Sequence, residues 1–187
     1  MLSDLPQWTS WAIPGALAVA GLATWLVMRR RRSYRWRLRA VLRAHGDALL
    51  RDLLIPDGLD GQIHVSHILR TDAGFVVVDV VPVAGAVFGA PSIDEWTVMA
   101  GRRAHKFRNP VASNRSRVLA VRSLVPGVPV HGLVVLLGPV SFPKGTPQAT
   151  VTIDTLGEAL DALLAAPPGA AWDDAWYGLA ACAARVK

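Results

Sequence analysis

The sequence predicts an α/β (α+β) domain that follows one transmembrane helix. Two observations support this fold class. Eighteen uncharged residues, Trp11–Met28, run directly into four arginines, Arg29–Arg32. Further along the chain, valine-rich apolar runs are typical of strands, and runs of helical periodicity occur before, between and after them. Helices around a central group of strands indicate a mixed sheet flanked by helices.

The apolar run Trp11–Met28 has the length of a membrane span. At a rise of about 1.5 Å per residue it would form a helix about 27 Å long, close to the hydrocarbon thickness of a bilayer. The arginines follow the run, whereas a cleavable signal peptide carries its positive charge first. We therefore expect a retained single-pass anchor in the cell (inner) membrane. Because positive charge stays in the cytoplasm, residues 1–10 should lie outside and the C-terminal domain inside.

The net charge of +6 is unevenly distributed along the 187 residues. Eight of the 20 Lys and Arg residues lie between Arg29 and Arg43, and the other 12 are balanced by 13 acidic residues after position 43. Such a basic segment suits an anionic lipid surface as well as DNA. The single cysteine, Cys182, excludes an internal disulfide, and no Cys/His set has the spacing of a zinc site.

Residues 29–54 are expected to form a basic juxtamembrane helix, followed by one domain at residues 55–187. From about Ser33 onward leucines recur at helical spacing, which predicts a helix that reaches Leu54. These leucines are Leu38, Leu42, Leu49 and Leu53. Arginines at steps of four line a different face of the same helix. About 155 residues follow the four arginines, enough for one domain with a core of its own.

A β-hairpin is expected at the start of this domain. Gln62–Leu69 has alternating character, Asp72–Gly74 has the composition of a turn, and Phe75–Val81 is rich in valine. Two further short strands are expected at 86–88 and 95–99.

Three helices and two strands are expected in the remainder. Val111–Leu124 has the apolar content of a helix, and Val130–Leu137 is a continuous apolar run typical of a strand buried on both faces. Ala149–Ile153 has the composition of a short strand. Thr155–Ala166 opens with a capping-box pattern, and Trp172–Val186 is expected to be the last helix.

An ordered series of short motifs runs through these elements and carries a resemblance. The motifs are Val65-Ser66-His67-Ile68-Leu69, Gly74-Phe75-Val76-Val77-Val78-Asp79, Gly85-Ala86-Val87-Phe88-Gly89, Trp96, Phe107-Arg108-Asn109-Pro110 and Leu133-Val134-Val135-Leu136. Over roughly residues 45–140 this order and spacing resemble the nuclease-related domain (NERD) family, a branch of the restriction-endonuclease-like PD-(D/E)XK superfamily. The resemblance implies a restriction-endonuclease-like mixed sheet.

The resemblance also implies a Mg²⁺-dependent nuclease site that this sequence does not reproduce. Family members hold the metal with an aspartate and a glutamate, and a lysine assists the chemistry on phosphate. Alignment on Gly74 places Ser66 at the aspartate, Asp79 at the glutamate and Val81 at the lysine. Ser113 stands where the family has a glutamine after Asn-Pro. Asp79 is therefore the one remaining candidate for a metal ligand. The favoured alternative is that Asp79 is a core acid paired with an arginine or with backbone N–H groups.

A second alignment matches Gln62-Ile63-His64 to the family's Gln-Ile-Asp and so places His64 at the metal aspartate. It also leaves Asp79 as the only carboxylate. His64 and His67 lie three apart in a predicted strand, so they point to opposite faces and do not form a two-histidine metal pair. His67 matches a histidine of the family's strand, for which we expect a structural role. A hydroxyl or imidazole with one carboxylate is a poor Mg²⁺ site, which favours loss of nuclease activity.

Seven basic residues form a local block, and no acidic residue occurs between Glu95 and Asp154. The block consists of Arg102, Arg103, Lys106, Arg108, Arg115, Arg117 and Arg122. In the resembling nucleases this region borders the substrate groove, so the block is a candidate surface for the phosphates of DNA or RNA. The alternative is an ordinary solvated face.

The sequence leaves three functions open. The favoured one is a membrane-anchored pseudoenzyme that binds nucleic acid or acts as a scaffold at the cytoplasmic membrane face and needs no cofactor. The second is an active Mg²⁺-dependent nuclease with an altered site that uses Asp79 with Ser66 or His64. The third is a structural component of a membrane assembly, in which the basic block and the C-terminal helix bind protein partners.

Overall fold

The computed structural model describes residues 9–58, 60–164 and 172–185. The chain divides into two compact units, Met1–Trp36 and Arg37–Lys187. Most of the expected extracytoplasmic segment, residues 1–10, lies outside the described residues.

The first unit contains most of a long helix, α1 (Thr9–Ala44), which includes the whole apolar run 11–28. Every described side chain between Leu17 and Met28 is exposed, while several others of this run are outside the described part. Within the residues that the structure describes, no helix offers a stretch both long and apolar enough to cross a membrane.

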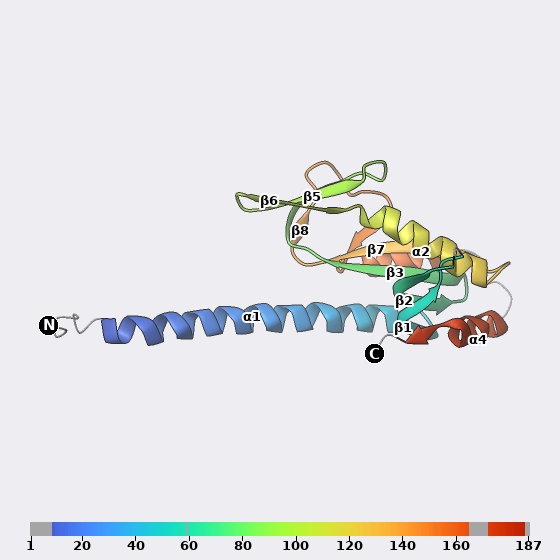
Figure 1. Cartoon of the computed structure of the whole chain (residues 1–187), viewed down its shortest axis with the longest axis horizontal. Helices are drawn as coiled ribbons and strands as arrows, with labels where there is room; N and C mark the ends of the chain where they lie inside the picture. The colour runs from blue at the N-terminus through green and yellow to red at the C-terminus, as the bar shows by residue number, and fades with distance from the viewer. Residues whose placement is uncertain (1–8, 59, 165–171, 186–187) are drawn as a thin grey trace. The chain divides into compact units, whose positions relative to one another are not determined.

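The second unit is built on a six-stranded mixed sheet with the order β10-β1-β2-β3-β7-β9. Its strands are β1 (Ala48–Pro56), β2 (Gln62–Thr71), β3 (Gly74–Pro82), β7 (Val130–Leu137), β9 (Thr150–Thr152) and β10 (Ala184–Arg185). Strands β1, β2 and β3 pair antiparallel, whereas β3, β7 and β9 pair in parallel. The expected hairpin is therefore confirmed, and so is the mixed sheet flanked by helices (Figure 1).

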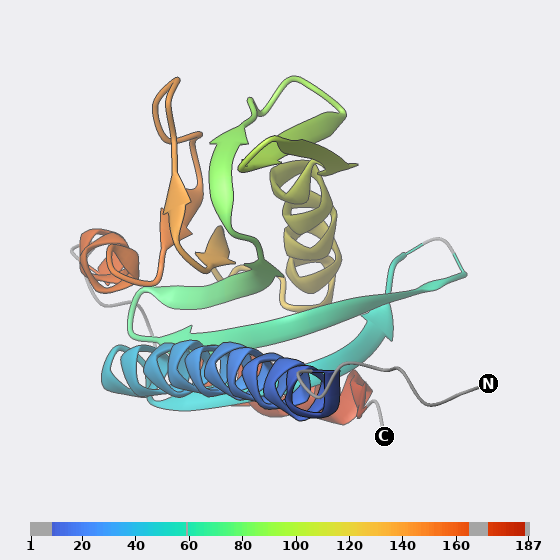
Figure 2. The same ribbon diagram turned by 90° about the vertical axis from the view of Figure 1, so that its left-hand side faces the viewer.

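A smaller four-stranded sheet lies beside the first, with the order β6-β5-β4-β8. It consists of β4 (Gly85–Phe88), β5 (Glu95–Ala100), β6 (Arg103–Arg108) and β8 (Val140–Ser141). Strands β5 and β6 form a hairpin at the edge of the domain (Figure 2). Strand β6 was not among the expected elements, because basic residues dominate it and only its pairing with β5 holds it extended.

The expected helix over residues 29–54 is wrong in its last ten residues. Helix α1 ends at Ala44, and β1 starts at Ala48. Gly46 allows the reversal, because a Cβ there would lie 2.5 Å from the carbonyl oxygen of Arg70. The leucines between 49 and 54 fit both helical and strand spacing, and pairing with β2 decides between them. Strand β1 therefore belongs to the domain and not to a juxtamembrane helix.

The last turns of α1 are also part of the second unit, which begins at Arg37. Leu38 and Leu42 are buried, at 3% and 0% exposure. Arg37 pairs with Asp154 at 2.6 Å. The domain therefore starts earlier than residue 55.

Three more helices complete the domain: α2 (Pro110–Leu124), α3 (Leu156–Leu164) and α4 (Asp173–Cys182). Apolar residues of α2 and α4 form one core with the large sheet, in which Phe75 meets Trp176 edge-on at 5.3 Å. A second core, which includes Trp96 and Leu136, joins the two sheets. The last helix ends at Cys182 and not at Val186, because Ala184 and Arg185 pair with β1.

Candidate functional site

Asp79 lies in the middle of the large sheet. It belongs to β3, opposite Val134 of β7, and is only 5% exposed. Its neighbours Val77 and Val78 are fully buried. A carboxylate buried among valines costs stability unless other groups compensate its charge.

Helix α2 supplies that compensation. The Oδ2 atom of Asp79 accepts a hydrogen bond from Nδ2 of Asn114 at 3.0 Å and forms an ion pair with Arg117 at 3.0 Å. Its Oδ1 atom is enclosed, without a hydrogen-bond partner in the described part of the chain. The Nε atom of Arg117 donates to the backbone carbonyl of His64 at 2.6 Å. Arg117 therefore ties α2 to both β2 and β3.

The Asn-Pro motif fixes the start of α2. Asn109 is the N-cap, and its Oδ1 accepts the N–H groups of Val111 and Ala112. Its Nδ2 donates to three backbone carbonyls in the loop before β5, at 2.8–3.3 Å. Pro110 fits the first turn because its missing N–H would have no partner there. The motif thus holds the helix start in place.

Asn114, one turn further, lies between α2 and the sheet. Besides Asp79 it donates to the carbonyl of Val77 at 3.2 Å. A Cβ on Gly132 of β7 would lie 2.1 Å from Oδ1 of Asn114, so glycine is needed for this close approach. Asn114 and Arg117 are three apart on one helix and so reach the same carboxylate.

A cavity of about 240 Å³ lies beside Asp79. It brings together all four positions that the alignment on Gly74 selects: Ser66, Asp79, Val81 and Ser113. Arg108 and Arg117 also line it. The four positions selected by the alignment thus surround one hollow, and its walls carry two guanidinium groups and one carboxylate.

His64, the candidate of the second alignment, does not line this cavity. Its side chain is 44% exposed, and its Nε2 lies 3.7 Å from Oδ1 of Asp52. Only its backbone carbonyl takes part in the site, through Arg117.

His67 is a partly buried histidine away from the cavity. Burial lowers its pKa below the ordinary value, and the charges of Arg51 and Arg39 lower it further, while Asp52 opposes the change. Its Nδ1 has no hydrogen-bond partner in the described part of the chain. We therefore treat His67 as a neutral structural residue at pH 7.

The cavity does not fit Mg²⁺. Asp79 is the only carboxylate in its walls, one of its oxygens is used by Arg117 and Asn114, and the other is enclosed. Among the residues that the structure describes, no three His, Cys, Asp or Glu side chains are placed to hold a metal ion. A hard cation that prefers six oxygen ligands finds too few here.

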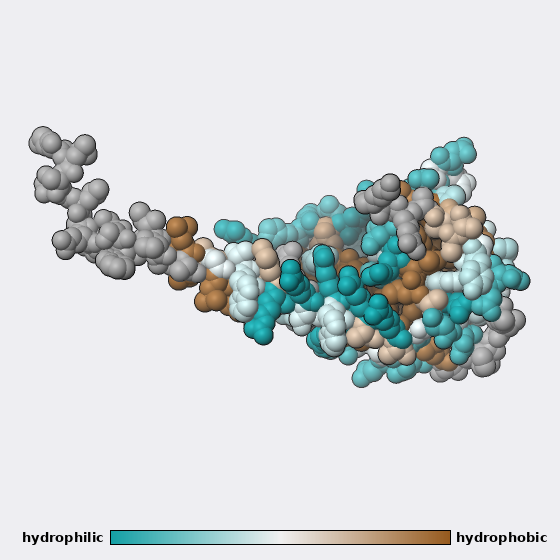
Figure 3. Space-filling view, turned by 90° about the horizontal axis from the view of Figure 1, so that it is seen from below, coloured by the Kyte–Doolittle hydropathy of each residue, from teal (hydrophilic) through white to brown (hydrophobic). Residues whose placement is uncertain are grey.

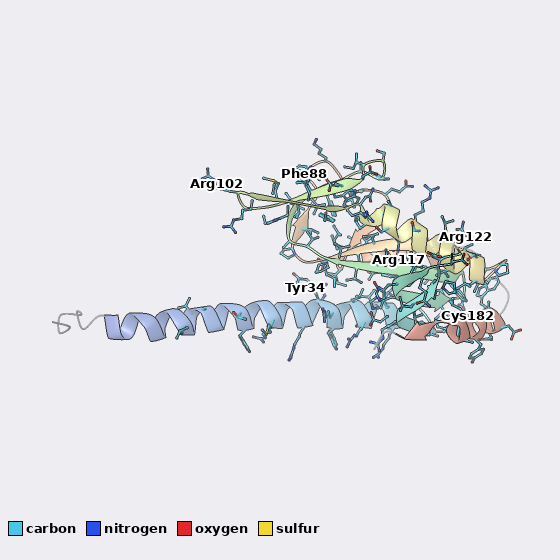
Figure 4. The ribbon with its side chains drawn as sticks, viewed as in Figure 1. Tyr34, Phe88, Arg102, Arg117, Arg122 and Cys182 are labelled. Atoms are coloured by element: carbon cyan, nitrogen blue, oxygen red, sulfur yellow. The ribbon has the colours of Figure 1, made fainter. Side chains whose placement is uncertain are left out.

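The basic block separates into two groups. Arg102, Arg103, Lys106 and Arg108 lie in the β5–β6 hairpin, whereas Arg115, Arg117 and Arg122 lie on α2. Figure 4 shows Arg102 and Arg122 at opposite ends of the domain.

Some members of the block are already paired. Arg122 donates to the carbonyl of Val130 at 3.0 Å, and Lys106 contacts Glu95 at 3.4 Å. Four exposed members form neither an ion pair nor a side-chain hydrogen bond within the described residues: Arg102, Arg103, Arg108 and Arg115.

The sequence predicts a core acid at Asp79 that pairs with an arginine or with backbone N–H groups, but it does not identify the partner as Arg117, which it places only in the basic block. The two residues are 38 positions apart, so no local pattern joins them. The available signal was the spacing of Asn114 and Arg117 after the Asn-Pro cap.

We predict strong energetic coupling between Asp79 and Arg117. Arg117→Met should lower the free energy of unfolding by about 3 kcal/mol, because it leaves a buried carboxylate without its counter-charge. The same change in an Asp79→Asn chain should cost less, with a coupling energy of about 1–3 kcal/mol. Urea unfolding of the two single variants and the double variant measures this.

The control is Arg115→Met, an exposed change on the same helix, which should stay within about 0.5 kcal/mol of the parent chain. Additive effects of the two site variants would contradict the assigned ion pair.

The comparisons with known proteins agree with this geometry. A family model described as nuclease-related domain (NERD) matches residues 30–137. The matched region contains β1 to β7, helix α2, Asp79 and Arg117. No curated protein and no solved structure matches the chain. Because the match covers more than half of the 187 residues, the chain belongs to the nuclease-related domain family.

Proposed function

We propose that this chain is a membrane-anchored NERD-fold protein that does not cleave nucleic acid and that binds it at the cytoplasmic face of the membrane. One observation supports the loss of catalysis: Arg117 forms an ion pair with the carboxylate of Asp79, and Asn114 donates a hydrogen bond to it. A carboxylate engaged in this way is not free to bind a metal ion.

The other positions of the site point the same way. Val81 offers neither charge nor a proton where the family has a lysine, and Ser66 offers a neutral hydroxyl in place of a carboxylate. The cavity therefore lacks both a group to activate water and the ligands for a metal that would do so. Its lining residues therefore support binding more than catalysis.

We predict that the purified full chain does not cleave DNA or RNA in the presence of Mg²⁺ or Mn²⁺. Supercoiled plasmid and a labelled RNA, followed by gel electrophoresis, give a sensitive measurement. The control is an Asp79→Ala chain prepared in the same way, which separates activity of this protein from a contaminating nuclease. Cleavage that disappears in Asp79→Ala would establish the active-nuclease alternative instead.

The basic residues of the β5–β6 hairpin, here called the hairpin group (Arg102, Arg103, Lys106 and Arg108), support binding of a polyanion. Arg102 and Arg103 are exposed and unpaired in the described part of the chain, and Lys106 has only a long, exposed contact with Glu95. Such side chains neutralise phosphates without reading base sequence. Few aromatic side chains accompany them, so stacking on single strands is not expected.

We predict salt-dependent binding of duplex DNA that depends on the hairpin group. To reduce the juxtamembrane contribution, the parent chain carries glutamine at positions 29–32; the four arginines left between positions 35 and 43 are the same in the parent and the variant. Replacing Arg102, Arg103 and Lys106 with glutamine should weaken binding equally for all sequences. The slope of log affinity against log salt should fall by about 0.9 for each phosphate that the variant no longer neutralises.

The fold should be retained in this triple variant, because exposed charges contribute little to stability. Fluorescence anisotropy at several salt concentrations measures the slope. If the parent chain binds no DNA at low salt, the hairpin is a solvated or protein-facing surface, and a structural role in a membrane assembly takes first place.

Membrane anchoring rests on the sequence of α1 and on its exposed side chains. Leu17, Val19 and Leu22 are 57–69% exposed on the helix, and Figure 3 shows strongly apolar residues on one stretch of its described part. Contiguous exposed apolar surface requires a lipid or protein partner. The Arg29 guanidinium lies 5.2 Å from the ring centre of Trp25, a pairing suited to a membrane interface.

We predict that a reporter fused after Lys187 reports a cytoplasmic location in a bacterial host. The reason is the arginine cluster that follows the apolar run. A matched fusion with glutamine at positions 29–32 should lose part of this orientation preference. Strong periplasmic activity of the unaltered fusion would refute the topology.

A further inference from the structure

We propose that the cavity beside Asp79 holds one phosphate of a bound DNA strand without a metal ion, with the guanidinium of Arg117 in place of the metal. This inference rests on the proposed binding of nucleic acid and adds a specific contact to it.

Arg117 has donors left for a ligand. A guanidinium carries five N–H groups. Two are used, by the carbonyl of His64 and by Oδ2 of Asp79, and the other three make no hydrogen bond within the described residues. The side chain is 24% exposed and lines the cavity. The bonds to His64 and Asp79 hold the guanidinium in place, and its remaining N–H groups are available to a ligand. This is the arrangement of a preorganised anion site.

The charge of the cavity favours an anion. Arg108 and Arg117 contribute two positive charges, and Asp79 contributes one negative charge, so the walls carry about one net positive charge. Ser66 adds a hydroxyl donor, whereas the Ser113 hydroxyl already donates to the backbone carbonyl of Asn109 at 3.2 Å. The cavity also borders the first turn of α2 at Pro110, where no acidic residue reduces the positive end of the helix dipole.

The position of Arg108 connects the cavity to the hairpin group. Arg108 is the last residue of β6 and also lines the cavity. A DNA strand that lies along the basic residues of β6 would therefore reach the cavity at the Arg108 end of β6. The volume of about 240 Å³ has room for a phosphate, and Val81, Phe107 and Pro110 offer apolar walls for the adjacent sugar.

The substitution Asp79→Asn distinguishes this arrangement from a metal site by the sign of its effect. In a metal site the change removes a ligand and weakens binding. In the proposed site it removes a negative charge next to the phosphate and frees Arg117, so binding becomes tighter. We expect about tenfold higher affinity for a short DNA duplex, the difference that one charge-assisted hydrogen bond makes. The affinity should be the same in EDTA and in Mg²⁺.

The experiment uses the full chain in detergent, with the same glutamines at positions 29–32, and fluorescence anisotropy; the thermal unfolding of each variant is recorded in parallel. Asp72→Asn is the matched control, because it removes one exposed negative charge in the β2–β3 turn and should change affinity less than about twofold. Arg108→Gln should weaken binding and lower the salt slope by about 0.9. Arg117→Lys should retain part of the affinity that Arg117→Met loses.

Unchanged or weaker binding of a folded Asp79→Asn chain overturns the proposed clamp, while the DNA-binding function remains if the hairpin variant still loses affinity. A requirement for Mg²⁺ also overturns the clamp. Absence of DNA binding by the unaltered chain refutes the clamp together with the proposed function, which separates the two failures.

Discussion

The burial of one carboxylate in the centre of a parallel strand pair is the constraint on which the rest of this domain depends. Asp79 is 5% exposed between β2 and β7, where a charge is stable only if the fold provides a counter-charge and donors. Arg117 and Asn114 provide them from α2. The position of α2 on the sheet is therefore set by electrostatics as well as by the apolar core.

This constraint changes the meaning of the motifs that resemble a nuclease. Asn109 caps α2 and bonds to the loop before β5, which fixes the helix from which Asn114 and Arg117 project. Gly132 leaves room for Asn114. In this chain the motif residues hold a neutralised carboxylate in place, beside a cavity with no second carboxylate in its lining.

The positive charge of the cavity also links the site to the β5–β6 hairpin. Where a metal ion would supply positive charge, this chain supplies it from Arg117 and from Arg108 at the end of β6. A protein positive charge is permanent and needs no cofactor, but it does not activate water. The proposed binding without hydrolysis rests on this difference, and the basic hairpin extends the positive surface beyond the cavity.

The sequence alone determined the β2–β3 hairpin, helix α2 and strand β7. Strand β2 alternates, β3 and β7 are apolar runs bounded by turn residues, and α2 follows Asn-Pro. It also selected Ser66, Asp79, Val81 and Ser113, which the fold brings to one cavity. Only the tertiary structure decided that residues 48–54 form a strand, since their leucines fit two periodicities and pairing with β2 selects one. The Asp79–Arg117 pair was likewise decided by the fold, because a contact across 38 residues leaves no local pattern and forms only when α2 packs on the sheet.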